Sequence, residues 1–388
     1  MAYYHLFPQI DTTIYSHPDR KNMNTGGDEI LEIIKERGTK DQRYYPSRIL
    51  IKFKNEDLLT VIEDVVGNNN FNNQGITVSS SVALKLHTAT PQNLSNVLNL
   101  ELYAVAESWN EGKGRYLNFP TSSGGATWTF RDGSVSGTEW TTSSFAANIT
   151  GSIIAPGITE GGAAWYTGSG FSATQTFYNE STLDTNFDVT SIVQKHSASA
   201  FASSTYPQGI VNNGFIIKQP NSIETNTSSS FGQLSYFSLD THTIYPPKLI
   251  FKWDDSIHNN QSQAKQNGDL NVTLYRNQEE YNQNDEAIFR IHVRDKYPTR
   301  QFASSSNYLN PGYFTTASYY SIRDAHTEEE VIPFDTSYTK LSSDSEGMYF
   351  KIFMKGLQPE RYYRILFKHK NNEGTKIYDN KYHFKVVR

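Results

Sequence analysis

The side chains of this sequence best suited to bind a ligand are four tryptophans near the middle of the chain. Trp109, Trp128, Trp140 and Trp165 lie in or beside loops that carry few charges. An indole ring in such a loop can stack on a sugar, and it can equally anchor a protein interface or fill a core, because large rings bury much area. We therefore take these four residues as candidates for an interface or a glycan site, with core packing as the alternative.

No catalytic, nucleotide-binding or metal-binding motif stands out in the sequence. The glycine-rich segments lack the Gly-Lys-Ser/Thr of a phosphate loop, and neither Gly-x-Ser-x-Gly nor His-Glu-x-x-His occurs. The pair Asp254-Asp255 could bind Ca²⁺ beside a loop, although a solvated strand end explains it better. The run Glu328-Glu329-Glu330 is typical of an exposed hairpin face. We expect no enzymatic activity, no cofactor and no metal.

The composition indicates an all-β protein without strong electrostatic steering. Of the 388 residues, 13% are aromatic and 19% are charged. Aromatic and β-branched runs between Gly, Ser, Asn and Thr clusters are typical of strands and turns. The formal net charge of −5 implies no nucleic-acid partner, and the lack of cysteine excludes disulfides and thiolate sites. We expect neither a signal peptide nor a membrane segment, because no basic stretch followed by an apolar core opens the sequence and no apolar run of about 18 residues occurs in it.

Strands of an N-terminal domain, residues 1–255, must position the tryptophans. In residues 48–53, and again in residues 248–253 after a double proline, every second residue is large and apolar. A strand points successive side chains to opposite faces, so each run aims three apolar side chains at one core. The second run is expected to close a β-sandwich that begins near Asp11. Long Gly/Ser/Thr-rich loops are expected between Tyr116 and Pro247, where binding tends to concentrate.

Two segments of this domain allow more than one interpretation. In residues 28–36, Ile30, Ile33 and Ile34 suit a helix stripe, but the short length and the bounding glycines suit a strand, which we favour. Residues 57–66 are expected to form a short helix or a turn after the preceding strand.

A second β domain is expected over residues 270–388. Residues 256–269 are polar and aperiodic, which predicts a linker between the two domains. Short strands separated by turns follow, a pattern typical of an immunoglobulin-like or fibronectin-III-like sandwich. The segment Gly356–Tyr363 also resembles the turn that places a corner tyrosine at the start of a strand.

Several short motifs follow one another along residues 10–255 in an order that resembles the DNRLRE family, a β-sandwich module related in shape to carbohydrate-binding modules. The resemblance implies a jelly-roll-like β-sandwich for the N-terminal domain. This sequence departs from the family where a tryptophan usually follows the Asp-Val-Thr turn, because His196 stands near that place. The motifs are Asp11–Ile14, Arg48–Phe53, Leu100–Tyr103 running into Trp109, Gly125–Trp128, Phe187–Thr190, Gly214–Ile217 and Pro247–Leu249.

The chain as a whole resembles virion structural proteins of large tailed bacteriophages, particularly marine T4-like ones. The start Tyr3–Pro8 and the run Gly27–Ile33 contribute to this resemblance. It implies a non-enzymatic component of the neck, tail or baseplate, with head decoration as another position. Its partners would be other virion proteins, and the protein would be present in several symmetric copies. Its location would be the virion, which is assembled in the host cytoplasm. The alternative is a carbohydrate-binding adhesin that recognises host surface glycans through the loop tryptophans.

Overall fold

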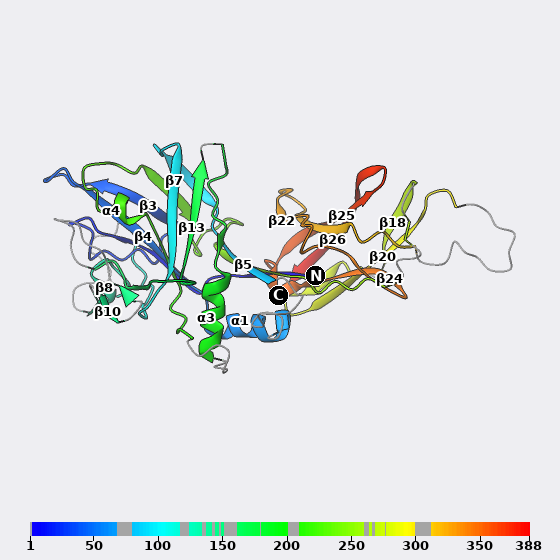
Figure 1. Ribbon diagram of the computed structural model, residues 1–388, viewed down its shortest axis with the longest axis horizontal. Coiled ribbons are helices and arrows are strands. Elements are labelled where there is room, and N and C mark those ends of the chain that lie inside the picture. The colour runs from blue at the N-terminus through cyan, green and yellow to red at the C-terminus, as the bar shows by residue number, and fades with distance from the viewer. Residues whose placement is uncertain are drawn as a thin grey trace. The chain divides into compact units, whose positions relative to one another are not determined.

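Figure 1 shows the computed structural model of the chain, which describes residues 2–67, 80–116, 124–133, 137–141, 144–146, 149–150, 161–178, 180–200, 209–259, 264–265, 268–275, 277–298 and 312–388. These residues divide into two compact units. The N-terminal unit takes its residues from Leu6–Asn72 and Ser81–Ile250, and the C-terminal unit from Met1–His5, Asn73–Ser80 and Phe251–Arg388. Nearly all regular structure in both units is antiparallel β-strand, so the predicted all-β sandwich fold is confirmed.

A large, curled antiparallel sheet forms much of the N-terminal unit. β13 lies at one end of its strand order, and β7 and β13 run side by side in Figure 1, as their register from Ser172↔Tyr103 to Tyr178↔Val97 requires. The order is β13 (Ser172–Tyr178), β7 (Val97–Ala104), β15 (Phe215–Lys218), β4 (Tyr44–Lys52), β3 (Ile30–Arg37), β16 (Gln233–Phe237) and β6 (Thr88–Gln92), and β2 (Ile10–Tyr15) also pairs with β4.

A smaller sheet, several short strands and a few helices complete the N-terminal unit. Of the two structures expected over residues 57–66, a short helix or a turn, the helix is the one that forms, and a longer helix follows the Asp-Val-Thr turn. The smaller sheet contains β17 (Lys248–Trp253), β5 (Ser80–Lys85) and β14 (Phe187–Asp188). The short strands are β8 (Phe130–Asp132), β9 (Thr138–Glu139), β10 (Ser144–Ala146), β11 (Ile149–Thr150) and β12 (Trp165–Tyr166). The helices are α1 (Asn55–Thr60), the π-helix η1 (Val61–Gly67), α3 (Thr190–Ala200) and α4 (Asn221–Glu224).

The strand interpretation of residues 28–36 is correct, because these residues contain β3. Leu31, Ile33 and Lys35 are buried along one face of β3. The alternate residues Ile30, Glu32, Ile34 and Glu36 are only partly buried on the other face. The isoleucine spacing that suits a helix therefore arises from a strand that carries isoleucines on both faces.

The central strands of the large sheet are covered on both faces. Ile49 and Ile51 of β4 are fully buried, as predicted from their alternation. Arg48 and Leu50, which point to the opposite face, are buried as well. A sheet with only one packed face would leave this second set in water. A second layer must therefore cover β4, and it is formed by the tryptophan-bearing loops described below.

Two β-sheets pack face to face in the C-terminal unit. Aromatic rings from the two sheets pack against each other in the core. The ring centres of Phe289 and Phe384 are 5.2 Å apart, and those of Tyr320 and Phe350 are 4.4 Å apart. One sheet has the order β18 (Leu270–Tyr275), β20 (Glu286–Asp295), β24 (Gly347–Phe353) and β23 (Ser342–Asp344). The other has the order β19 (Glu280–Asn282), β26 (Gly374–Val387), β25 (Arg361–Asn371), β21 (Ser318–Asp324) and β22 (Glu330–Ile332), and the 3₁₀ helix η4 (Met354–Gly356) precedes β25.

This strand order has the topology of an immunoglobulin-like sandwich. The first sheet corresponds to strands A, B, E and D, and the second to A′, G, F, C and C′, with β19 parallel to β26. The corner tyrosine is Tyr363, whose buried hydroxyl donates a 2.8 Å hydrogen bond to the Gln358 carbonyl upstream of β25. The prediction of an immunoglobulin-like C-terminal sandwich is therefore confirmed.

The boundary between the units differs from the one expected after residue 255. The Tyr3 hydroxyl donates a 2.9 Å hydrogen bond to the Asp335 carboxylate, and the ring centres of Trp253 and Phe353 are 5.9 Å apart. The first strand β1 (Ala2–Leu6) and the end of β17 therefore pack within the C-terminal unit. The expected linker is also partly structured, because the Ser343 N–H donates to the Ile257 carbonyl at 2.8 Å. Polar composition alone did not reveal this pairing, which is made by backbone groups.

No helix among the residues that the structure describes is both long enough and apolar enough to cross a membrane.

Candidate functional site

The four candidate tryptophans are buried in one core cluster. Trp109, Trp128, Trp140 and Trp165 expose 3%, 1%, 3% and 2% of their surface, and they pack together with Leu50 and other apolar residues. Rings this deeply buried offer no face to a sugar or to a neighbouring protein. The prediction that they form an interface or a glycan site is therefore wrong for this structure, and the core-packing alternative holds.

Backbone hydrogen bonds fix two of these rings in the cluster. The indole N–H of Trp109 donates to the Asn213 carbonyl, and that of Trp140 donates to the Thr127 carbonyl, each at 2.9 Å. A buried indole needs such a partner, because an unpaired N–H away from water is costly. The neutral loops thus fold back over the sheet and tie down their own rings.

The other two rings flank a buried arginine. The guanidinium carbon of Arg48 lies 4.6 Å from the centre of the Trp128 ring and 5.1 Å from that of Trp165. Arg48 also donates to the Gly162 carbonyl. Gly162 has a φ of +81°, and a Cβ there would stand 2.6 Å from Arg48 Nη1, so only glycine fits this approach.

Arg48 belongs to a buried ion network on the covered face of the sheet. Its guanidinium donates to both carboxylate oxygens of Glu224, at 3.1 and 2.7 Å. The ammonium of Lys218 lies 3.4 Å from Glu224 and 3.5 Å from Glu101. Burial lowers the pKa of Lys218, while the Glu224 carboxylate opposes that effect. These charges are arranged to satisfy one another, so the network stabilises the fold and offers little to a ligand.

The acidic segments singled out in the sequence have local structural partners. Asp254 accepts hydrogen bonds from the backbone N–H and the hydroxyl of Ser256, and these bonds together with Lys340 hold its pKa below the usual range despite burial. In the Glu328–Glu330 run, Glu330 pairs with Arg323 at 2.6 Å, and Glu328 pairs with Arg364. The contacts of Asp254 fit a strand end, and those of the Glu328–Glu330 run fit a hairpin face, which are the structural alternatives given above for these two segments. Among the residues that the structure describes, no group of His, Asp and Glu side chains could hold a metal ion.

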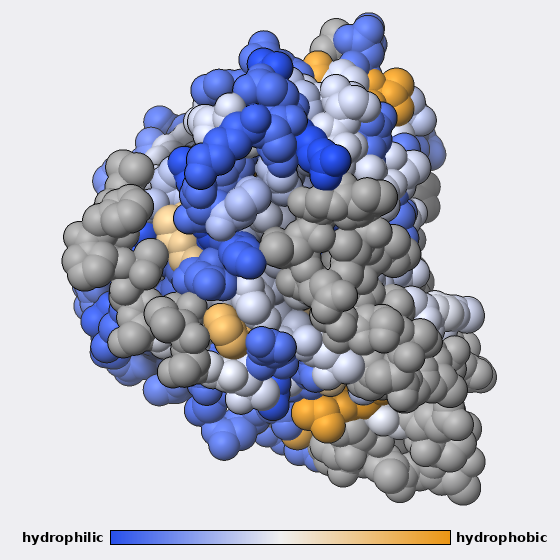
Figure 2. All heavy atoms as spheres, turned by 90° about the vertical axis from the view of Figure 1, so that its left-hand side faces the viewer, coloured by the Kyte–Doolittle hydropathy of each residue, from blue (hydrophilic) through white to orange (hydrophobic). Residues whose placement is uncertain are grey.

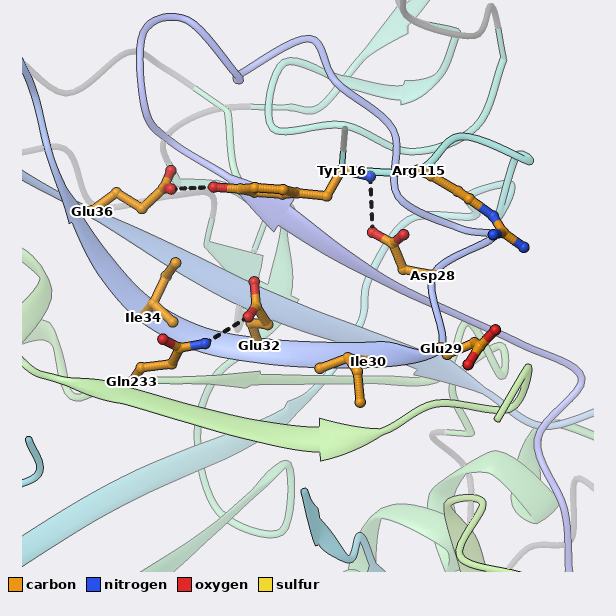
Figure 3. Close-up of a pocket in the computed structure, with 9 residues that line it drawn as sticks. All are labelled: Asp28, Glu29, Ile30, Glu32, Ile34, Glu36, Arg115, Tyr116 and Gln233. Carbon is orange, nitrogen blue, oxygen red and sulfur yellow. Dashed lines mark hydrogen bonds between the residues drawn. The ribbon is translucent and has the colours of Figure 1, made fainter. Parts of the chain in front are cut away.

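The N-terminal unit contains a cavity of about 640 Å³ (Figure 3). None of its lining residues was among the candidate site residues named from the sequence. Its floor is the partly buried face of β3, where isoleucine and glutamate alternate. Residues from two distant parts of the chain complete it. We call this cavity the β3 groove; it is lined by Asp28, Glu29, Ile30, Glu32, Ile34, Glu36, Arg115, Tyr116 and Gln233.

Hydrogen bonds hold the carboxylates of the β3 groove in place. Gln233 Nε2 on the neighbouring strand β16 donates to Glu32 Oε1 at 2.8 Å, and the Tyr15 hydroxyl donates to Glu32 Oε2 at 2.7 Å. The backbone N–H of Tyr116 donates to Asp28 Oδ2 at 3.0 Å, and its hydroxyl donates to Glu36 Oε1. The carboxylate positions are therefore set before any ligand arrives.

Negative charge in the β3 groove is only partly compensated. Burial and the nearby Glu32 raise the pKa of Asp28 to about 6, although Arg115 opposes this rise. Burial also raises the pKa of Glu36, although its ion pair with Arg20 works in the other direction. The second oxygen of Glu36, Oε2, is shielded from solvent and has no hydrogen-bond partner among the described residues. Two of the carboxyl groups therefore lack the full set of donors that would stabilise their charge.

The sequence held one signal for the β3 groove. If residues 28–36 form a strand, Ile30, Glu32, Ile34 and Glu36 lie on the same face, and isoleucine and glutamate alternate along it. The strand interpretation therefore implied a row of carboxylates on this face. The contributions of Tyr116 and Gln233 had no such signal, because they depend on contacts with residues about 80 to 200 positions away.

No protein-family model and no curated protein matches this chain.

Proposed function

We propose that this protein is a non-enzymatic structural component of a tailed-phage virion, at the neck, tail or baseplate, with head decoration as a further position. It would act through contacts with other virion proteins and be present in several symmetric copies. The proposal starts from the sequence resemblance to such proteins. It is supported by the division into two β units whose aromatic and buried charged side chains serve internal packing.

The observation that carries the proposal is the outward face of β13. This strand contains no charged residue, and its alternate residues Ser172, Thr174, Thr176 and Tyr178 are exposed. Tyr178 is 60% exposed and lies opposite Val97 of β7, which is 52% exposed. Strands at the end of a sheet usually carry charges or prolines that prevent pairing with other chains. A charge-free terminal strand with an exposed aromatic side chain is instead suited to a protein contact.

On the face drawn in Figure 2, most of the described residues are hydrophilic, and the hydrophobic ones lie in small separate groups. Non-obligate interfaces are about as polar as the rest of a protein surface, with a few aromatic anchors. This surface therefore suits a protein that folds first and then joins an assembly.

Recognition of a host glycan is the competing function. It depended on tryptophan rings presented by loops, and the burial of Trp109, Trp128, Trp140 and Trp165 removes that support. A glycan array probed with the whole chain distinguishes the two functions, because the assembly proposal expects no saturable glycan binding.

A charge placed on β13 tests the proposed contact face. Thr176→Lys is expected to reduce incorporation of the protein into particles several-fold, because an exposed lysine on a terminal strand opposes docking. Thr138→Lys, on the exposed short strand β9, is the matched control and is expected to incorporate normally. Both variants should retain the melting temperature of the parent. Equal incorporation of the two variants would remove β13 as the contact face.

A further inference from the structure

We propose that the β3 groove binds an aliphatic side chain that ends in an ammonium group, presented as a lysine by a neighbouring protein. This inference rests on the assembly function proposed above and names the chemistry of one contact. It depends on the shape, the lining and the charge of the groove.

The size of the groove suits a few side chains of a partner. Its volume of about 640 Å³ falls within the range of ligand-binding clefts in proteins. Ile30 and Ile34 provide apolar surface, and Glu32 and Glu36 stand between and beyond them on the same face of β3. A lysine side chain has the same two parts, an apolar stem and a charged end. Its stem can lie on the isoleucines while its ammonium group reaches a carboxylate.

The charge of the groove favours a cation. Four carboxylates line it, at Asp28, Glu29, Glu32 and Glu36, against the single guanidinium of Arg115. Burial and neighbouring charge raise the pKa of Asp28 to about 6. An ammonium group would supply donors to these carboxylates and lower the cost of their charge.

The chain already places one cation of its own at the end of the groove. Arg20 pairs with Glu36, and its guanidinium carbon lies 4.0 Å from the centre of the Tyr116 ring. The Tyr116 ring also packs against Tyr15, with ring centres 5.2 Å apart. The ring is thus engaged by the protein itself, so stacking on a sugar is disfavoured, and the open part of the groove consists of carboxylates and isoleucines.

The spacing of the carboxylates defines the partner further. Glu32 and Glu36 lie four residues apart on one face of β3, which is about 13 Å for an extended chain. An extended peptide with two lysines four residues apart has the same spacing. The best-matched partner segment is therefore an extended one that carries lysine at every fourth position.

A peptide titration with the purified full chain tests this inference. The probe is a synthetic heptapeptide with lysines at its second and sixth positions, and the matched peptide has norleucine at both, which keeps the stem and removes the charge. We expect the lysine peptide to bind about tenfold more tightly than the norleucine peptide at low salt, with the difference shrinking as salt is added. Equal binding of the two peptides would overturn the inference.

Two protein variants locate the binding. Asp28→Asn with Glu36→Gln keeps acceptors for the Tyr116 hydrogen bonds and removes two charges, and we expect it to weaken binding of the lysine peptide about fivefold. Glu63→Gln, an exposed carboxylate on η1 outside the groove, is the control and should bind as the parent does. Unchanged affinity in the double variant would place the peptide elsewhere and contradict the inference.

Two small-molecule arms distinguish other ligands. If 1,5-diaminopentane binds as tightly as the lysine peptide, the groove serves a free polyamine and the protein partner is wrong. If a neutral oligosaccharide binds and the lysine peptide does not, the groove is a glycan site. Peptide binding and the presence of the protein in virions are measured independently. If the lysine peptide does not bind, the proposed virion function is unaffected. If the protein is absent from virions, the binding of lysine by the β3 groove is unaffected.

Discussion

Arg48 shows how a single residue determines the role of the tryptophans. On β4 it lies on the face that the alternation pattern assigns to the outside, where an arginine is usually solvated. Instead it is 1% exposed, flanked by Trp128 and Trp165, and paired with Glu224. The loop rings are therefore needed inside the unit, to shield this charge and the strand beneath it.

Loss of Arg48 is expected to destabilise the N-terminal unit strongly. Arg48→Met removes the arginine that donates to both oxygens of the buried Glu224, which we expect to cost about 3–5 kcal/mol of unfolding free energy. The double variant Arg48→Met, Glu224→Leu should be less destabilised than the single one, because no buried charge is left unpaired. Urea unfolding followed by tryptophan fluorescence measures both. A double variant that loses the sum of the two single losses would contradict this account of the pair.

Asp11 is expected to make stability fall as the pH rises. Burial raises the pKa of its carboxyl to about 8, to which the nearby Glu111 and Asp240 contribute. An unfolded chain releases this proton near pH 4, so between about pH 4 and pH 8 the folded state binds more protons than the unfolded state. Stability should therefore decrease over this range, by at most about 1.4 kcal/mol per pH unit for this group.

Asp11→Asn checks this pH dependence. The amide oxygen still accepts the hydrogen bond that the Leu239 N–H donates at 2.7 Å, and the titrating group is gone. We expect a flatter stability profile between pH 4 and pH 8 and a more stable protein at pH 8. Asp64→Asn, at an exposed position on η1, is the control and should keep the parent slope. An unchanged slope in Asp11→Asn would assign the dependence to other groups.

At the scale of the elements, the sequence predicts what local patterns encode. The alternating runs of β4 and β17, the strand β3 and the corner turn before β25 all follow from residues close together in the chain. The sequence did not predict which loops cover the second face of β4. That cover brings Trp128 and Trp165 against Arg48, about 80 to 117 positions away, and no local pattern reports such a contact.

The corner of the C-terminal sandwich offers a matched test of one element. Tyr363→Phe removes the hydroxyl that donates to the Gln358 carbonyl, and we expect a loss of about 1–3 kcal/mol because that acceptor is left unpaired. Tyr362→Phe changes the adjacent, exposed tyrosine and should have little effect. Thermal unfolding of the two variants gives the comparison. Equal losses would show that the corner hydrogen bond contributes nothing specific.

At the scale of the whole molecule, the two units have separate cores, and each should respond to its own mutations. Four of the five tryptophans lie in the N-terminal unit, and Trp253 lies in the C-terminal unit. In calorimetry we expect two unfolding transitions, with Arg48→Met lowering the temperature of one and Tyr363→Phe that of the other. A single transition shifted by both variants would mean that the units unfold together.

The proposed role in a virion is decided most directly by the composition of purified particles. Quantitative mass spectrometry of gradient-purified virions from a lysate that contains this protein measures its copy number against the major capsid protein. The proposal expects a fixed, reproducible number of copies per particle, consistent with a symmetric position in the neck, tail, baseplate or head. Finding the protein in the lysate but not in intact particles would contradict it.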